Sequence, residues 1–397
     1  MQFAEIINQQ EVKKQLAELV QHNRLSHALL FLGKEGCGAL PMALAFAQYV
    51  VCEKTNNRQP APSLFGDELT NYQQPVTSND SCGVCPGCLK AQQLIHPDIH
   101  FSYPVVTKKP GTPPISTDYI SEWREFIKNS PYGNVYDWLQ FIGAENKQGN
   151  ITAFECNDII RKLNLKSFES EYKILIMWMP EYLGNEGNKL LKLIEEPPAN
   201  TLFILVAENE NLVLPTIVSR CQLIKIPALE TKDIAEALIK RNNIDPTKAR
   251  QIAGISDGNY HDALQLVQAA EDDFEKFLRD WLNAILKTGP LAQTKWVEEI
   301  SRLGREKQKQ FLRYFNHLLE QAIRLRTAGL QTGDNMENDF AERLNKIAGI
   351  EQQQAIIEEL DKAAYYIERN ANAKILFHAL TIKLYHIIQD KIVFLMD

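Results

Sequence analysis

Residues 33–40 read Gly-Lys-Glu-Gly-Cys-Gly-Ala-Leu, and this stretch decides how the N-terminal part of the chain folds. Gly33 and Gly38 have the spacing of the phosphate-binding loop G-x-x-x-x-G-K-[ST]. The two residues that carry the phosphate chemistry are missing, because Ala39 stands at the lysine position and Leu40 at the hydroxyl position. We therefore expect a vestigial phosphate loop that does not support hydrolysis.

The sequence on either side fits this interpretation. An apolar run of strand length at residues 28–32 precedes the loop, and a helical pattern at residues 40–47 follows it. The motif requires this order of strand, glycine loop and helix. The alternative is an ordinary glycine-rich turn. If the loop is vestigial, the amides near Gly33, Gly36 and Gly38 retain at most weak nucleotide binding.

A second element of an ATPase site is also missing. Such enzymes need an acidic residue at a strand end to hold magnesium. The candidate strand at residues 173–177 is followed by Trp178 and Met179 in place of acids, and Glu181 lies beyond a proline and is expected to point elsewhere. We expect no nucleotide-bound metal at this position.

The composition limits the class of protein. A length of 397 residues predicts two to three domains, and 45% hydrophobic residues is typical of a globular protein. A net charge of −7 argues against a chain whose overall electrostatic field attracts nucleic acid. No apolar run reaches the length of a membrane span, and the first residues do not resemble a signal peptide, so we expect a cytoplasmic protein.

The chain has seven cysteines, three of which form a C-x2-C-x2-C run at Cys82, Cys85 and Cys88. This spacing lets one loop place several thiolates around a zinc ion. The candidates for the fourth ligand are Cys52, His96 and His100. With Cys52 the site would be a closed, structural Zn²⁺ site. An iron–sulfur cluster and the absence of a metal are the alternatives.

Arg220 is the candidate catalytic residue. It lies in a Ser-Arg-Cys sequence that follows an apolar strand at residues 202–206. One interpretation is that Arg220 pairs with a carboxylate of its own chain and holds its own turn. The other is that its permanently charged, planar guanidinium reaches a phosphate.

Four passages now appear in a recognisable order. They are residues 26–33, the cysteine run closed by His-Pro-Asp at 96–98, the Glu-Glu-Pro-Pro segment within 188–198, and the Ser-Arg-Cys segment within 215–222. Together they resemble the clamp-loader branch of the AAA+ family, and within it the ATPase-inactive branch of the bacterial DNA polymerase III loader. The resemblance covers most of residues 1–227.

The resemblance implies a fold and a function. The fold is an α/β, RecA-like parallel sheet with an inserted zinc module, a small helical lid and an all-α C-terminal collar. The chain would be a non-hydrolysing scaffold that supplies Arg220 in trans as an arginine finger to a neighbouring motor subunit. The implied partners are the gamma/tau motor subunits and the delta subunit, with the sliding clamp and primed DNA reached through the complex and no membrane. The chain alone would have no ATPase activity, although it would be part of a nucleotidyltransferase holoenzyme.

Two positions depart from the nucleotide-binding members of that family. His261 stands where they place a lid arginine, and Asn209, the candidate sensor residue, has Glu208 beside it. An unperturbed histidine is mostly neutral near pH 7, and an acid repels phosphate.

We expect three domains. Residues 1–227 form the RecA-like domain, with the zinc module at 52–100 and a further insertion at 103–150 that we expect to be a surface elaboration. Residues 228–269 form the lid and residues 270–397 the collar. Two other functions remain open: a self-sufficient AAA+ ATPase with an atypical loop, and a zinc-dependent nucleic-acid-binding protein, which the acidic charge disfavours.

Overall fold

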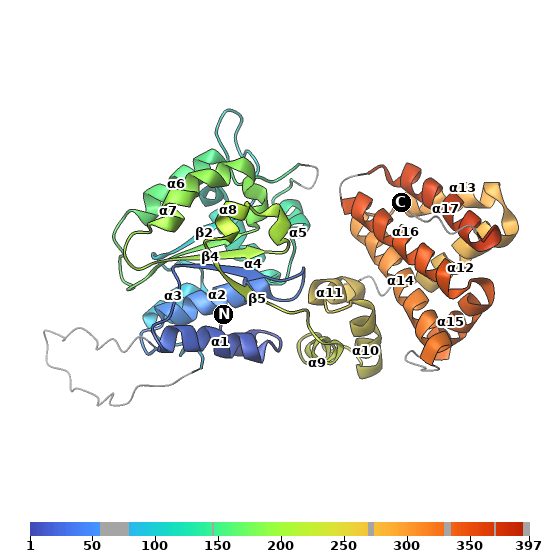
Figure 1. Ribbon diagram of the computed structural model, residues 1–397, viewed down its shortest axis with the longest axis horizontal. Coiled ribbons are helices and arrows are strands. Elements are labelled where there is room, and N and C mark those ends of the chain that lie inside the picture. The colour runs from blue at the N-terminus through green and yellow to red at the C-terminus, as the bar shows by residue number, and fades with distance from the viewer. Residues whose placement is uncertain (56–78, 145–146, 269–273, 329–334, 369–370, 392–397) are drawn as a thin grey trace, which may run out of the picture. The chain divides into compact units, whose positions relative to one another are not determined.

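The computed structural model gives the fold of most of the chain (Figure 1). It describes residues 1–55, 79–144, 147–268, 274–328, 335–368 and 371–391. The contacts divide the chain into two units, Met1–Asp233 with Gly258–His261, and Ile234–Asp257 with Asp262–Asp397. The domain boundaries predicted at 227 and 269 stay predictions, and the second of them lies outside the described residues, as do positions 56–78 of the predicted zinc module.

The first unit contains a five-stranded parallel sheet in the order β2-β3-β4-β1-β5. The strands are β1 (Ala28–Leu32), β2 (Ile99–Ser102), β3 (Lys173–Trp178), β4 (Thr201–Ala207) and β5 (Gln222–Lys225). The predicted strands at 28–32, 173–177 and 202–206 are confirmed. They read as unbroken apolar runs because helices cover both faces of a parallel sheet.

Alternate residues of the central strands enter two separate cores. Leu29, Ile174 and Ile204 pack on one face with the wholly buried helix α2 (Ala39–Val51). Leu30 and Leu175 pack on the other face with α6 (Ala153–Leu163) and α7 (Leu191–Glu195). The period of two along each strand thus gives every central strand two buried faces. The remaining helices of this unit are α1 (Gln10–Gln21), α3 (Pro86–Gln92), α4 (Ile120–Asn129), α5 (Val135–Phe141) and α8 (Pro215–Val218).

Much of the described part of the insertion at 103–150 lies in the core, although residues 107–112 are exposed, so the expectation of a surface elaboration is wrong. Trp123 and Trp138 are fully buried. The ring of Trp123 stacks on Tyr103 with centroids 4.0 Å apart, and its centroid lies 5.3 Å from that of Trp178 of β3. These large aromatic rings bury too much apolar area to remain on the surface. They pack the insertion against the carboxyl end of β3.

The second unit has no strand among its described residues. Its helices are α9 (Thr231–Asn242), α10 (Pro246–Ile255), α11 (Tyr260–Gln268), α12 (Phe274–Asn283), α13 (Pro290–Ser301), α14 (Arg305–Ala328), α15 (Asn335–Ile347), α16 (Ile350–Glu368) and α17 (Ala373–Gln389), of which α9 and α11 begin within the first unit. Asp245 caps the N-terminus of α10, since its carboxylate accepts two backbone amides. Trp281 and Trp296 stack at the centre of this unit with centroids 4.4 Å apart.

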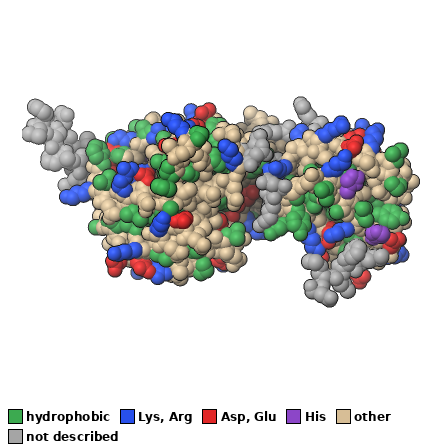
Figure 2. Space-filling model, turned by 90° about the horizontal axis from the view of Figure 1, so that it is seen from above, with side chains coloured by type: hydrophobic (Ala, Val, Ile, Leu, Met, Phe, Trp, Pro, Cys, Tyr) green, Lys and Arg blue, Asp and Glu red, His purple; other side chains and the backbone are tan. Residues whose placement is uncertain are grey.

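Two surface properties bear on the class of protein. No helix in the described ranges is both long enough and apolar enough to cross a membrane. On the face seen in Figure 2, basic and acidic side chains are interspersed and do not form a broad basic field. Binding to the phosphates of nucleic acid depends on such a field.

Candidate functional site

The glycine loop joins β1 to α2, in the predicted order of strand, loop and helix. Gly36 and Gly38 have φ angles of +70° and +93°, which glycine adopts without a steric cost. Ala39 and Leu40, at the positions of the missing lysine and hydroxyl, are buried in the apolar core. The loop therefore keeps the backbone shape of a phosphate cradle but lacks both the lysine and the hydroxyl of the motif.

Tyr132, from the insertion, fills the space above this loop. A Cβ atom added to Gly38 would stand 3.0 Å from Cε1 of Tyr132. The Tyr132 hydroxyl accepts a 3.1 Å hydrogen bond from the Ile7 amide, and the ring meets Tyr260 edge-on with centroids 5.0 Å apart. The cavity left above the loop is about 30 Å³. Small-molecule pockets are larger and measure about 300–1,000 Å³.

Polar side chains fix the loop from a second side. The Glu35 carboxylate accepts hydrogen bonds from the side-chain amides of Asn134, at 3.2 Å, and Asn259, at 3.4 Å. Nδ1 of His261 lies 3.3 Å from the Asp137 carboxylate, and Nε2 lies 3.9 Å from that of Glu35. His261 is thus engaged by acids of its own chain, and Glu35 adds negative charge to the loop itself.

The residues at the strand ends beside the loop also make structural contacts within the chain. Trp178 is buried at the end of β3. Glu181 accepts the amides of Glu208 and Asn209, at 2.7 and 2.9 Å, and burial raises the pKa of Glu181. The side-chain oxygen of Asn209, the candidate sensor, accepts the Asn211 amide at 3.0 Å. These groups hold the turn after β4.

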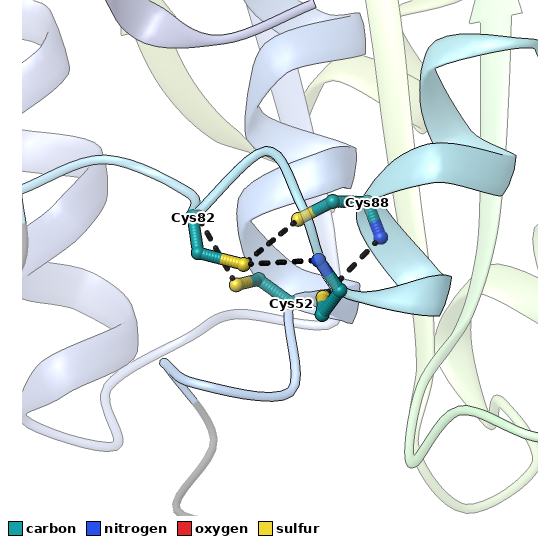
Figure 3. A group of neighbouring side chains, drawn as sticks. Cys52, Cys82 and Cys88 are labelled. Carbon is teal, nitrogen blue, oxygen red and sulfur yellow. Dashed lines mark hydrogen bonds between the residues drawn. The ribbon is translucent and has the colours of Figure 1, made fainter.

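The four predicted cysteine ligands meet at one point. Figure 3 shows Cys52, Cys82 and Cys88 of this group. Cys52 is the C-cap of α2, Cys85 is the N-cap of α3, Cys88 lies in the first turn of α3, and Cys82 precedes that helix. Their sulfur atoms all lie within 4.8 Å of one another. Of the four, Cys82 is partly buried and the other three are buried.

The two histidine candidates lie elsewhere. Nε2 of His96 is 3.7 Å from the Glu169 carboxylate, and Nδ1 of the same ring accepts the Asp98 amide. His100 lies on β2, where burial lowers its pKa to about 4. Neither histidine belongs to the group of cysteines that the structure brings together.

The cysteine geometry fits a metal held by four thiolates. Sγ of Cys82 is 3.9 Å from Sγ of Cys88, and a tetrahedron with metal–sulfur bonds of about 2.3 Å has edges of about 3.8 Å. The amides of Cys82 and Cys85 point at neighbouring sulfurs from 3.4 Å. The hydrogen bond between Cys88 and Cys52 lowers the pKa of Cys52 and raises that of Cys88. Amide donors favour the thiolate form that a metal requires, so this cluster could hold a metal with no position left open.

Arg220 lies in the turn between α8 and β5, and its guanidinium contacts its own chain. Nε donates to Oε1 of Glu195 at 2.6 Å, and Nη2 contacts the same oxygen. Nη1 donates to the Thr216 carbonyl at 2.7 Å and to the Ser219 hydroxyl at 3.3 Å. This pairing agrees with the interpretation in which Arg220 holds its own turn. The role in trans stays a prediction.

Comparison with known families matches residues 8–230 to the family described as DNA polymerase III, delta subunit. This range is more than half of the chain. The chain belongs to this family. The part matched to the DNA polymerase III delta-subunit family includes the glycine loop, the four cysteines and Arg220.

Two curated relatives are bacterial replication proteins. DNA polymerase III subunit delta′ of Bacillus subtilis (strain 168) is 27% identical over 266 residues, which are 67% of this chain and 60% of that protein. DNA polymerase III subunit tau of the same organism is 23% identical over 326 residues, which are 80% and 46% of the two chains. The chain therefore spans less than two thirds of the length of these relatives.

Solved structures of similar proteins include a DNA polymerase III gamma subunit-related protein from Thermotoga maritima MSB8. The alignment covers 94% of this chain and 99% of that one, with 14% identity and a TM-score of 0.37.

Proposed function

We propose that this chain is a non-hydrolysing, delta-prime-type subunit of a DNA polymerase III clamp loader. In this role it scaffolds the loader and lends Arg220 to the ATP site of a neighbouring motor subunit. The neighbour's ATP then drives loading of the sliding clamp onto primed DNA. Membership of the family supports the assembly, and the filled cradle above the glycine loop is the observation that supports the non-hydrolysing role.

Three properties of the cradle oppose nucleotide binding. Its free volume is about 30 Å³, with the ring of Tyr132 over Gly38. The loop carries the Glu35 carboxylate next to Lys34, and Ala39 does not supply the lysine of the motif. A triphosphate would have to displace the ring and face this charge at short range. The same features oppose the weak nucleotide binding that the loop amides alone would allow. They also oppose the alternative of a self-sufficient ATPase.

The proposal for Arg220 depends on its chemistry and exposure. A guanidinium is always charged and matches two phosphate oxygens at once. The Arg220 side chain keeps 35% of its surface exposed, so a partner could reach it. An arginine finger supplied by a neighbour accelerates phosphoryl transfer by about 10³–10⁵-fold.

We propose that the four cysteines hold a structural Zn²⁺ ion. When bound, zinc would link the end of α2 to the start of α3 and would take no part in chemistry, because four thiolates leave no open position. The link also fixes the end of the helix that begins at the glycine loop. The bound ion would therefore crosslink two helices of the first unit.

The proposed partners follow from the same assignment. They are gamma/tau-type motor subunits and the delta subunit, with the clamp and primed DNA reached through the complex in the cytoplasm. The net charge of −7 and the interspersed charges on the face seen in Figure 2 give no support for a lone chain that binds nucleic acid through zinc.

Reconstitution with motor and delta subunits tests the role of Arg220. Arg220→Ala should leave assembly intact and lower DNA-stimulated ATP hydrolysis at least tenfold. Arg250→Ala, which changes an exposed arginine of α10, is the matched control and should leave the rate unchanged. Hydrolysis by the Arg220→Ala assembly at the wild-type rate would show that Arg220 is not a finger.

A motif-restoration experiment tests the closed cradle. Ala39→Lys with Leu40→Thr restores both motif residues, but Tyr132 still fills the space, so ATP affinity should remain weak. Adding Tyr132→Ala should raise the affinity at least tenfold over that double variant, whereas adding Tyr132→Phe, which keeps the ring, should not. Tight binding by the double variant alone would contradict the role of Tyr132.

A further inference from the structure

The contacts of Arg220 leave little of its guanidinium available to a ligand. The group has five N–H donors. Its four contacts are two with Oε1 of Glu195, one with the Thr216 carbonyl and one with the Ser219 hydroxyl. The edge formed by Nε and Nη2, one of the edges that can grip two phosphate oxygens, faces Glu195. A phosphate that uses this edge has to replace the carboxylate.

Glu195 and Arg220 are nevertheless placed to separate. Their side chains are 45% and 35% exposed, so water can solvate both charges once they part. Exposed ion pairs of this kind change an equilibrium by no more than about fivefold. A terminal phosphate carries more negative charge than a carboxylate and offers three oxygens. The carboxylate is therefore a weak competitor that a correctly placed triphosphate can displace.

We propose that Glu195 is a positioning residue that masks Arg220 in the free chain and releases it to the terminal phosphate of a nucleotide in a neighbouring subunit. This inference rests on the proposed role of Arg220 in trans. Glu195 ends α7 in the Glu-Glu-Pro-Pro segment, and Arg220 lies in the Ser-Arg-Cys segment, so the ion pair joins the two sequence signatures across 25 positions. Before assembly the pair weakens the binding of phosphates in solution to the guanidinium by up to about fivefold, and during assembly it holds the side chain near the position from which it acts.

The lone chain gives the first test, because masking does not depend on any partner. An arginine-selective dicarbonyl such as phenylglyoxal modifies accessible guanidinium groups, and peptide mass spectrometry reports its rate at Arg220. Glu195→Gln keeps the shape and removes the charge, so it should raise that rate by up to about fivefold. Glu196→Gln changes the adjacent exposed acid and should leave the rate at the wild-type value. An unchanged rate in Glu195→Gln would overturn the masking proposal.

The reconstituted loader gives the second test. Glu195→Gln should raise kcat/KM for ATP by up to about fivefold, and this rise should vanish when Arg220→Ala is also present. A fall in kcat/KM would mean that Glu195 supports the finger without masking it, and an equal rise without Arg220 would mean that the effect runs through another group; either result rejects the proposal. If Arg220→Ala alone leaves hydrolysis unchanged, the role in trans fails, while the measurement on the lone chain still decides whether Glu195 masks Arg220.

Discussion

Replacement of Tyr132 by alanine tests whether the chain's own side chain occupies the phosphate cradle. Tyr132 is only 6% exposed and packs over Gly38 and against Tyr260. Truncating a buried aromatic ring to alanine costs about 3–5 kcal/mol of unfolding free energy. The lost hydroxyl also leaves the buried Ile7 amide without its hydrogen bond, at a cost of about 1–3 kcal/mol when water cannot enter. Because the emptied cradle admits water to that amide, we expect a total near 4 kcal/mol.

The phenylalanine variant separates the two contributions. Tyr132→Phe keeps the ring and loses only the hydrogen bond to Ile7, so it should cost about 1–2 kcal/mol. Scanning calorimetry should show the transition of the first unit lowered by about 8–16 °C in Tyr132→Ala and by about 2–8 °C in Tyr132→Phe. Hydrogen exchange of the loop peptide at residues 33–40 should rise more in the alanine variant. A loss below about 1 kcal/mol in Tyr132→Ala would refute the packing of this ring over the glycine loop.

Three further predictions concern the metal, the pH dependence of stability and the core. Purified protein should contain about one zinc per chain by mass spectrometry, Cys85→Ser should lose it, and Cys156→Ser, a buried cysteine outside the cluster, should retain it. Burial raises the pKa of Glu181 above its usual 4.5, so the folded state binds this proton more tightly than the unfolded chain. Stability should therefore fall as the pH rises from about 4.5 through the folded-state pKa, and urea midpoints should show a flatter profile in Glu181→Gln. Trp138→Ala should cost about 3–5 kcal/mol in urea unfolding, whereas Phe168→Ala, at a side chain 82% exposed, should change stability by less than about 0.5 kcal/mol.

The sequence predicted those parts of the fold whose signal is local. The strands β1, β3 and β4 are continuous apolar runs, and their burial on both faces explains why they could be found. The sequence did not predict β2, because four residues that include His100 and Ser102 give too short a pattern. The cysteine spacing identified three of the four cysteines that cluster, and Cys52 could be named because it ends the helix that follows the glycine loop.

The sequence could not predict the contacts between distant segments. Tyr132 lies about a hundred positions after the loop that it covers, and no local pattern links the two. The insertion has many prolines and polar residues at its start, which suggested a surface loop and hid the burial of Trp123 and Trp138. The pairing of Glu195 with Arg220 likewise depends on the fold, which brings the end of α7 to the turn before β5. Such contacts follow from packing and have no sequence period of their own.

Titration of magnesium-ATP into the purified lone chain, with hydrolysis followed in the same sample, tests the central claim most directly. If Tyr132, Glu35 and Ala39 close the cradle as described, neither binding below millimolar ATP nor turnover should be detected. Micromolar binding or steady magnesium-dependent turnover by the lone chain would contradict the account.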